Sequence, residues 1–582
     1  MKKTPIYLII GLLCFALVPL HVAESVEIPS ISDKISELEL PNGLKIVVVE
    51  RHNAPVFFAM MTFRVGSTIE DSDLSGLSHF MEHMLFKGSK TFGTTNYKKE
   101  VPIMNELDRL ALRMRDLQVA SGWRFQMFED FSTETRANLP LELRERHAED
   151  DAYRWRQSIE ILSAEDLEFP DKWSDYPWIF EEDGRNFWKD YLEVLDIRSK
   201  MAELIKKQRE YIVQSSLDEV YKMNGAVRFN AYTSFDETAY LVGLPSNALE
   251  LWMQLESDRF INPVFREFYP EREVIQEELR MREATPTGKM YQNLLSSAFR
   301  AHPYGRPIIG WLSDIQITLR DDMAEHYRRY YAPNNCQIIL SGSVNPDEVF
   351  KLARKYFGKW KPAEVAHEVK VIEPPQEGER RTYVEFDAEP QFMAGYRVPT
   401  VTHPDWYALS MMTQVLSSGR TSRFYRNIFE KGLTSSAPGA WIGPSQRYPG
   451  LFIVSAVPRS PHSVDEIENI IYEEIEKLAN EPVNEWELER IRNMYMRLNF
   501  DRLRNNQWIA FTLNSAYVTY GDWRPYEMHM ERMLSVTPED IQRVAKIYFD
   551  PKNRTVVNLI RPSDANSKGN NNGIIETGIM EQ

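Results

Sequence analysis

Hydrophobic and polar positions follow two different periods near the start of the chain. The stretches 44–49 and 56–63 are rich in β-branched and aromatic residues, which predicts two strands, and Asn42-Gly43 predicts a tight turn before the first. Apolar residues then recur at helical spacing from Leu77 to Leu85, with Ser75 in the position of an N-cap. Strands followed directly by a helix indicate the beginning of an αβ domain.

The same alternation returns further along the chain and predicts a larger set of elements. Strands are expected at 229–233, 238–242 and 337–342, and helices at about 247–260 and 270–282. The pattern therefore continues the αβ organisation well beyond the first helix.

Changes in composition divide the chain into parts. A charge-rich stretch at 363–381, with Pro374-Pro375 near its centre, indicates a linker. It separates a first domain at 34–362 from a second αβ domain at 382–561. The residues at 562–582 are polar and predict a disordered tail.

One segment of the first domain does not fit the αβ pattern. Two long charged helices are expected at about 96–118 and 191–214, and five of the 13 tryptophans lie between them. We interpret the segment as a helical insertion whose aromatic residues form a small core of their own. The alternative is a lid or docking surface, because exposed aromatic residues among charges suit contact with a partner.

Composition sets limits on the class of protein and on its compartment. With 582 residues, 43% of them hydrophobic, the chain can form two or more cores, and its net charge of -16 argues against binding to nucleic acid. Residues 1–23 resemble a secretory signal peptide, because Lys2 and Lys3 precede an apolar run that is too short to span a bilayer. We therefore expect an exported, periplasmic protein whose mature chain has no membrane span and keeps Cys336 as its single cysteine.

The predicted helix at 77–85 carries the most informative chemistry. His79, Glu82 and His83 share one helix face, where two imidazoles one turn apart can hold one zinc ion. A glutamate between them is close enough to act as a general base toward a water on the metal. This order, H-x-x-E-H, is the reverse of the H-E-x-x-H zinc motif. The alternative is an ordinary helix with two histidines and a surface acid.

A third ligand has to come from another part of the chain. Glu271 and Glu278 are seven residues apart on the predicted helix at 270–282, so they share a face. Acids along a helix usually form only its solvated side. A carboxylate that joins two histidines and leaves one position open is, however, a known catalytic arrangement.

Several motifs in a fixed order show a resemblance to a known family. His79-Phe80-Met81-Glu82-His83 resembles the zinc site of the M16 metallopeptidases, which include mitochondrial processing peptidase, pitrilysin and insulin-degrading enzyme. Five further segments resemble family landmarks: Leu40-Pro41-Asn42-Gly43-Leu44, Asn230-Ala231-Tyr232-Thr233, the segment from Glu271 to Glu278, His302-Pro303-Tyr304-Gly305 and Pro333-Asn334-Asn335. The resemblance implies an α+β fold with two homologous αβ domains of the LuxS/MPP-like metallohydrolase type.

The resemblance also implies roles for individual residues. His79, His83 and Glu278 would bind one Zn²⁺ per chain, and Glu82 would be the general base. Glu271 would orient a ligand. Asn230 and Ala231 would lie on an edge strand to which the substrate backbone adds as an extra strand. Glu277 is the neighbouring choice for the third ligand, but Glu278 keeps the seven-residue spacing from Glu271.

Two departures from the family pattern are informative. The long separation between His83 and Glu278 places an insertion at about 98–222 inside an intact domain. Many relatives also hold the substrate with an arginine and a tyrosine, where this chain has Ile428 or Phe429 and then Ser435. A chain without this clamp is expected to form a dimer, either a heterodimer with an M16-like subunit that carries the clamp or a homodimer.

The resemblance implies a zinc-dependent endopeptidase that hydrolyses peptides or unfolded segments. The first alternative is a non-catalytic binding or assembly subunit of an M16-type complex, since the clamp is missing. A purely structural zinc site is the weaker alternative, because such sites normally close with four protein ligands.

Overall fold

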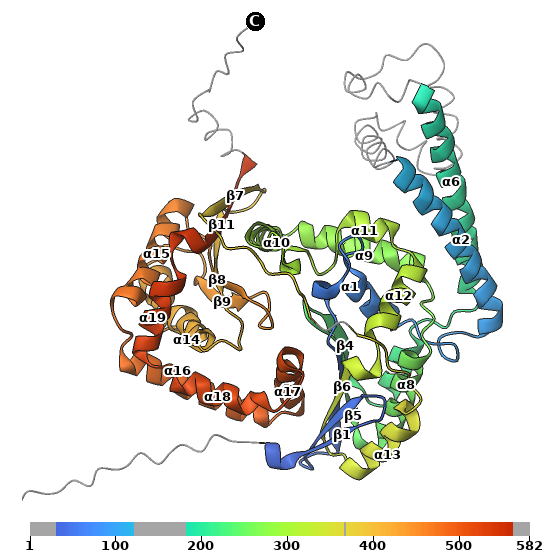
Figure 1. Cartoon of the computed structure of the whole chain (residues 1–582), viewed down its shortest axis with the longest axis horizontal. Coiled ribbons are helices and arrows are strands. Elements are labelled where there is room, and N and C mark those ends of the chain that lie inside the picture. The colour runs from blue at the N-terminus through green and yellow to red at the C-terminus, as the bar shows by residue number, and fades with distance from the viewer. Residues whose placement is uncertain (1–30, 122–181, 366–367, 563–582) are drawn as a thin grey trace, which may run out of the picture.

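The computed structural model describes residues 31–121, 182–365 and 368–562. The predicted signal peptide, most of the tryptophan-rich segment and nearly all of the predicted tail lie outside these ranges. Two β-sheets with helices packed against them form the body of the molecule (Figure 1).

The first sheet has six strands in the order β1-β2-β6-β3-β5-β4. Parallel pairing occurs only between β2 and β6, and the other neighbours are antiparallel. The central strands are buried on both faces, which explains why they appear in the sequence as continuous apolar runs rather than as an alternation. The strands are β1 (Ile35–Glu39), β2 (Lys45–Glu50), β3 (Val56–Phe63), β4 (Val227–Thr233), β5 (Thr238–Pro245) and β6 (Cys336–Gly342).

The second sheet repeats this topology with five strands in the order β7-β11-β8-β10-β9. Its one parallel pair, β7 with β11, corresponds to β2 with β6, and β1 has no counterpart. The prediction of an α+β fold with two homologous domains is therefore confirmed. The strands are β7 (Arg380–Glu385), β8 (Gln391–Val398), β9 (Gly439–Gly443), β10 (Gly450–Ala456) and β11 (Arg554–Ile560).

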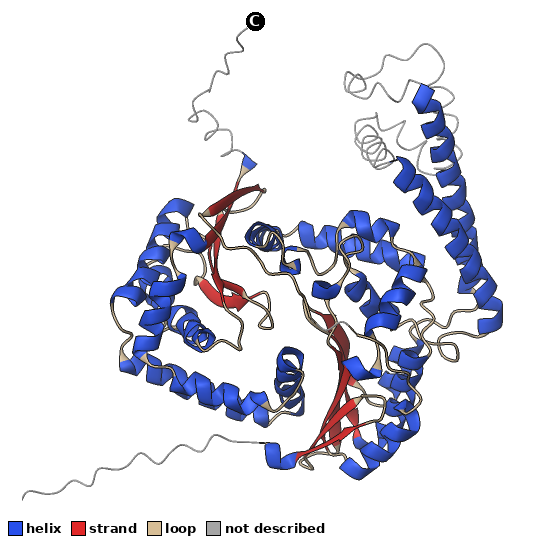
Figure 2. Cartoon of the chain, viewed as in Figure 1, coloured by secondary structure: helices blue, strands red, loops and turns tan. Residues whose placement is uncertain are grey.

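The helices lie mostly on the outer faces of the two sheets (Figure 2). Those of the first domain are α1 (Leu77–Met84), α2 (Tyr97–Ser121), α6 (Glu182–Arg209), α7 (Ser216–Met223), α8 (Leu249–Ile261), α9 (Phe268–Glu283), α10 (Pro286–Ala298), α11 (Leu312–Ile317), α12 (Arg320–Tyr330) and α13 (Pro346–Phe357). Those of the second are α14 (Asp405–Ser417), α15 (Val464–Asn480), α16 (Glu485–Leu503), α17 (Asn506–Tyr520), α18 (Pro525–Ser535) and α19 (Pro538–Tyr548). None of the described helices is long and apolar enough to cross a membrane.

Each domain places one helix on the sheet of the other domain. Helix α17 buries Ile509 and Leu513 against Phe58 and other residues of the first sheet. In return, α10 buries Leu294 against Ile453 and its neighbours on the second sheet. Burying one such side chain contributes about 1.5–3 kcal/mol, so these two exchanged helices fix how the domains sit together.

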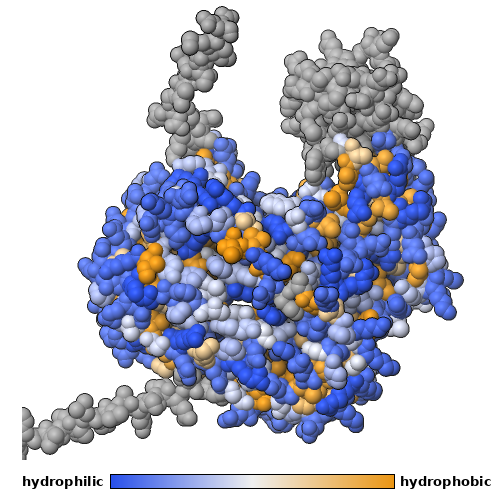
Figure 3. Space-filling model, in the orientation of Figure 1, coloured by the Kyte–Doolittle hydropathy of each residue, from blue (hydrophilic) through white to orange (hydrophobic). Residues whose placement is uncertain are grey.

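Helices α2 and α6 lie side by side and project from the first domain as a long hairpin (Figure 1). Their inner faces join the main core through Leu110 and Ile197, and Arg113 pairs with Glu193 at 2.7 Å. Much of the molecular surface is polar, with apolar residues scattered over it, some of them along the hairpin (Figure 3). Helix α6 ends at Arg209, earlier than the predicted 214, because the following residues turn back to pair with the segment before α2.

Candidate active site

Helix α1 begins at a backbone position that requires glycine. Gly76 has a φ of 90°, and a Cβ atom there would lie 2.3 Å from the carbonyl oxygen of Ile309. The prediction that Ser75 caps the helix is wrong, because its hydroxyl donates to Asp314 instead. The buried carboxylate of Glu70 accepts hydrogen bonds from the amides of Gly76 and Ser78 at 2.7 and 2.6 Å. Glu70 thus accepts hydrogen bonds from the first amides of the helix although it lies six residues before Gly76, which is outside the spacing of a capping motif.

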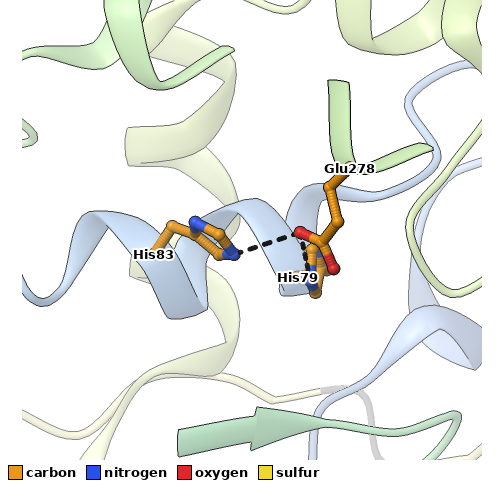
Figure 4. A group of neighbouring side chains, drawn as sticks. All are labelled: His79, His83 and Glu278. Carbon is orange, nitrogen blue, oxygen red and sulfur yellow. Dashed lines mark ion pairs between the residues drawn. The ribbon is translucent and has the colours of Figure 1, made fainter. Parts of the chain in front are cut away.

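Two histidines of α1 and one glutamate of α9 converge on a single point (Figure 4). Oε2 of Glu278 lies 3.6 Å from Nε2 of His79 and 3.6 Å from Nε2 of His83. Within the described ranges, this is the only group of three histidine, cysteine or acidic side chains whose ligand atoms lie within 4.8 Å of one another. The structure therefore brings together the three residues that the sequence singled out for a metal.

The distances fit the geometry of a tetrahedral zinc site. Two ligand atoms that are each about 2.1 Å from a shared tetrahedral zinc lie roughly 3.4 Å apart. The observed 3.6 Å between the carboxylate oxygen and each imidazole nitrogen is close to this value. Two imidazoles and one carboxylate also form the donor set of a catalytic site that keeps one position open.

The protonation states also suit metal binding. Burial, together with the nearby His83 and Arg282, lowers the pKa of His79 to about 3, so its imidazole is neutral. Nδ1 of His83 lies 2.8 Å from Oε1 of Glu271, an acceptor that keeps the proton on Nδ1 and leaves Nε2 free as a ligand atom. Burial alone would lower the pKa of His83, but the hydrogen bond to Glu271 and the negative charges of Glu271, Glu82 and Glu278 together raise it.

Glu271 is in turn held by Lys87, whose ammonium lies 2.6 Å from its other oxygen. Burial opposes ionisation of this carboxyl, but the hydrogen bonds with His83 and Lys87 prevail and lower its pKa to about 2. Glu271 is therefore ionised and oriented toward His83. Lys87 follows α1 by three residues and was not singled out by the sequence, because a lone lysine carries no recognisable signal.

Glu277 and Glu278 are adjacent on α9 but point in different directions. Glu277 pairs with Arg280 at 3.0 Å, and its side chain is 62% exposed. Glu278 faces the two histidines with one oxygen and accepts from Arg282 at 2.6 Å with the other. The structure thus places Glu278, and not Glu277, beside the histidines.

Glu82 points toward β4 rather than into the group of three ligand atoms. The hydroxyl of Thr233, the last residue of β4, donates to its Oε2 at 2.7 Å. Burial raises the pKa of Glu82, and the hydrogen bond from Thr233 opposes this rise. Thr233 lies within the segment Asn230-Ala231-Tyr232-Thr233, but sequence reasoning gave it no role because its contact with Glu82 arises only in the folded sheet.

Strand β4, which carries Asn230 and Ala231, is the outermost strand beside the site. Asn230 faces Leu241 and Ala231 faces Tyr240 on the inner neighbour β5. In the described part of the chain no strand pairs with the outer side of β4. This edge leads directly to Thr233 and therefore to Glu82.

Ile428 and Ser435 occupy the positions where many relatives carry the arginine and the tyrosine of the substrate clamp. Ile428 is fully buried in the core of the second domain, within the single π-helical turn Tyr425–Phe429. Ser435 is exposed. Neither residue could act as a guanidinium or a phenol toward a peptide.

Comparison with known families decides the classification. A model of insulinase, peptidase family M16, matches residues 45–106 and 206–311, and a model of the peptidase M16 inactive domain matches residues 318–495. Together these matches cover more than half of the chain. The protein belongs to the M16 peptidase family. The first match is interrupted where the α2–α6 hairpin leaves the M16 domain. The inactive-domain match extends from α12 into α16, and this stretch contains no H-x-x-E-H motif.

Similar M16 proteins include named zinc proteases. The zinc protease PqqE of Helicobacter pylori is 28% identical over 371 residues, which are 62% of this chain and 83% of that protein. A probable mitochondrial-processing peptidase subunit beta of Arabidopsis thaliana is 24% identical over 392 residues, covering 65% of this chain and 72% of the relative.

Solved structures share the fold at lower identity. A protease from Helicobacter pylori has a TM-score of 0.65 and 22% identity, over 90% of this chain and 99% of the other. The periplasmic protease PqqL from Escherichia coli has a TM-score of 0.61 and 16% identity, over 93% of this chain but only 49% of that one. This M16 chain therefore corresponds in fold to about half of PqqL.

Proposed function

We propose that this M16 chain is a zinc-dependent endopeptidase that hydrolyses peptides or unfolded protein segments. The observation that carries the proposal is the convergence of His79, His83 and Glu278 at tetrahedral spacing, with the carboxylate of Glu82 on the same helix. The named zinc proteases among its relatives support it.

Each residue of the site would have a distinct role. His79, His83 and Glu278 would hold one Zn²⁺, which when bound supplies a Lewis acid and lowers the pKa of a water molecule toward neutrality. Glu82 would take a proton from the attacking water and deliver it to the leaving amine. Thr233 would hold Glu82 in place through its hydrogen bond, and Glu271 would keep His83 in the tautomer that binds metal.

Strand β4 would bind the substrate. No other described strand pairs with its outer edge, so an extended peptide could add there as a further strand beside Asn230 and Ala231. Recognition through main-chain hydrogen bonds depends little on side chains. This mode suits an enzyme that cuts varied peptides.

We propose further that the chain acts as a dimer in an exported, periplasmic setting. Its fold matches about half of PqqL, a periplasmic protease, so a second chain would supply the other half of such an assembly. Because Ile428 is buried where a clamp residue is expected, the partner is either an M16-like subunit that carries the clamp or a second copy of this chain. The predicted signal peptide, at 1–23, would direct export.

The second candidate function is a non-catalytic binding or assembly subunit. It is favoured by one observation, the absence of the arginine and tyrosine at Ile428 and Ser435. The intact set of His79, Glu82, His83 and Glu278 argues against it, since a subunit without turnover has no need for both a general base and three metal ligands.

The purified chain can distinguish the two functions. It is incubated with a library of unstructured peptides, with and without a chelator, and products are identified by mass spectrometry. Cleavage that the chelator abolishes and added zinc restores supports the endopeptidase. If neither the chain alone nor its native complex cleaves any peptide while zinc is bound, the endopeptidase proposal is rejected and the binding subunit is favoured.

A further inference from the structure

A cavity of about 440 Å³ lies at the end of β4 that is farther from Glu82. Its walls come from the turn between β2 and β3, the first residues of β3 and β4, the last residues of β5 and the turn between α16 and α17. Arg51 lines it from the first of these turns, Arg228 from β4 and Arg504 from the second turn. Four side-chain amides also line it, those of Asn53, Asn505, Asn506 and Gln507, and no described aspartate or glutamate does.

The three arginines are not neutralised by described carboxylates. Arg51 donates to Oδ1 of Asn506 at 2.9 Å and to the carbonyl of Arg504 at 3.0 Å, and both acceptors are neutral. Arg228 contacts the side-chain oxygen of Gln507, and Arg504 lies over the Phe500 ring. Burial lowers the pKa of Arg51, as expected for a cation without an acidic partner.

Most of the protein has the opposite electrostatic character. The chain has a net charge of -16, and arginines close to the site, such as Arg280 and Arg282, are paired with glutamates. A concave pocket lined by guanidinium groups without acids is therefore a local exception that attracts anions. The fork of a guanidinium fits the two oxygens of a carboxylate in particular.

The cavity borders the first residues of β4, the strand to which a peptide would add. Thr233 contacts Glu82, and Arg228 is five residues earlier on the same strand, which corresponds to roughly 15 Å of extended chain. The strand bulges between Val227 and Asn230, and Arg228 has a φ of 55°. A bulge re-aims the side chains beside it, and here it places Arg228 in the cavity wall rather than in the alternation of the strand.

We propose that this cavity is a subsite for a carboxylate that the substrate carries about five residues from the bond that is cut. The inference rests on the proposed peptidase function and adds a substrate preference to it. The carboxylate can be an aspartate or glutamate side chain or the C-terminal carboxylate of the peptide. Because side chains of an extended peptide alternate between faces, only every second internal position can direct an acid into the cavity.

The test uses a series of peptides that share one sequence except for a single glutamate, which is placed at successive positions on either side of the scissile bond. Each peptide is compared with the same peptide that carries glutamine at that position. A second arm compares a free C-terminus with an amidated one. We expect kcat/KM to rise roughly tenfold when the acid is about five residues from the cut, and not at the neighbouring positions. In the double variant Arg228→Gln/Arg504→Gln, the ratio of kcat/KM for the acidic peptide to kcat/KM for the neutral peptide should fall to about one.

Arg420→Gln is the matched control, because it also removes an exposed arginine but lies outside the cavity. It should keep the preference. A ratio that does not depend on the position of the acid, or that survives in the double variant, would overturn the subsite. If no peptide is cleaved at all, the proposed function fails instead. The subsite is then decided by the dissociation constants of the same peptides, measured by fluorescence anisotropy on the full chain.

Discussion

Two adjacent glutamates of α9 differ in their relation to the histidines of α1. Glu278 and Glu277 carry the same charge, but only Glu278 faces His79 and His83. We predict that Glu278→Gln lowers zinc occupancy by at least tenfold, since an amide oxygen is a much weaker ligand than a carboxylate. Glu277→Gln should bind zinc like the wild type. Metal analysis of the dialysed proteins tests this, and equal occupancy in both variants would exclude Glu278 as a ligand.

The hydroxyl of Thr233 has a separate effect on the proposed base. Thr233→Val keeps the shape of the side chain but removes the hydrogen bond to Glu82, so the carboxylate loses its fixed orientation. We predict that kcat falls about tenfold with zinc content unchanged. Thr233→Ser restores the hydroxyl and should restore most of the rate. Steady-state kinetics on one peptide would show whether the valine and serine variants differ, and equal rates would remove Thr233 from the mechanism.

The sequence predicts single residues well where the signal is local. His79, Glu82 and His83 lie within one helical turn, so their common face follows from the helix alone. Ser75 was predicted as the cap by the same local reasoning, but Asp314, far along the chain, binds its hydroxyl. Contacts between distant segments decide such cases, and local patterns contain no information about them.

At the scale of elements, a buried arginine organises the loop that follows α1. Arg266 is 1% exposed, pairs with the fully buried Glu100 of α2, and donates to the carbonyls of Lys87, Ser89 and Phe92. It therefore ties the base of the hairpin to the residues just after α1.

Removing this cation should destabilise the first domain. Arg266→Met leaves the carboxylate of Glu100 buried without its partner, which costs about 3–5 kcal/mol, and we predict a fall in the apparent melting temperature of roughly 10 °C. The double variant Arg266→Met/Glu100→Met should recover most of this loss. Thermal unfolding followed by circular dichroism tests both. A single variant that melts like the wild type would show that the pair does not support the domain.

Elements with a strong local pattern were predictable, and their partners were not. The strands and α9 follow from apolar periodicity, and their bounds agree with the predicted ranges to within a few residues. The neighbours of each strand in the sheet could not be predicted in this way. Strands β4 and β6 lie far along the chain from β2 and β3, yet all four belong to one sheet. The resemblance to the M16 family supplied the type of fold and the edge position of the strand with Asn230 and Ala231, but not the strand order.

At the scale of the whole molecule, one carboxyl links the two domains in a pH-dependent way. Glu237, in the turn between β4 and β5, accepts a hydrogen bond from Asn514 of α17 at 2.6 Å. Burial raises its pKa to about 7, Asn514 and Tyr232 oppose the rise, and Asp236 adds to it. The folded protein therefore binds a proton here at pH values where the unfolded chain, with a pKa near 4.5, has lost it.

The sign of the effect follows from this difference. Between about pH 4.5 and 7 the native state holds more protons than the unfolded state, so the contribution of Glu237 to stability decreases as pH rises. We predict that Glu237→Gln raises the melting temperature at pH 8 relative to wild type, and that the two proteins converge near pH 5. Parallel melting curves at the two pH values would contradict this.

The central claim is that Glu82 acts as a base at a metal site to which it does not itself bind. The most direct test measures zinc content and peptide cleavage together for the wild type, Glu82→Gln and the control Glu277→Gln. We predict close to one zinc per chain in all three, with cleavage lowered at least a hundredfold in Glu82→Gln alone. A Glu82→Gln protein that binds zinc and cleaves at the wild-type rate would contradict the account.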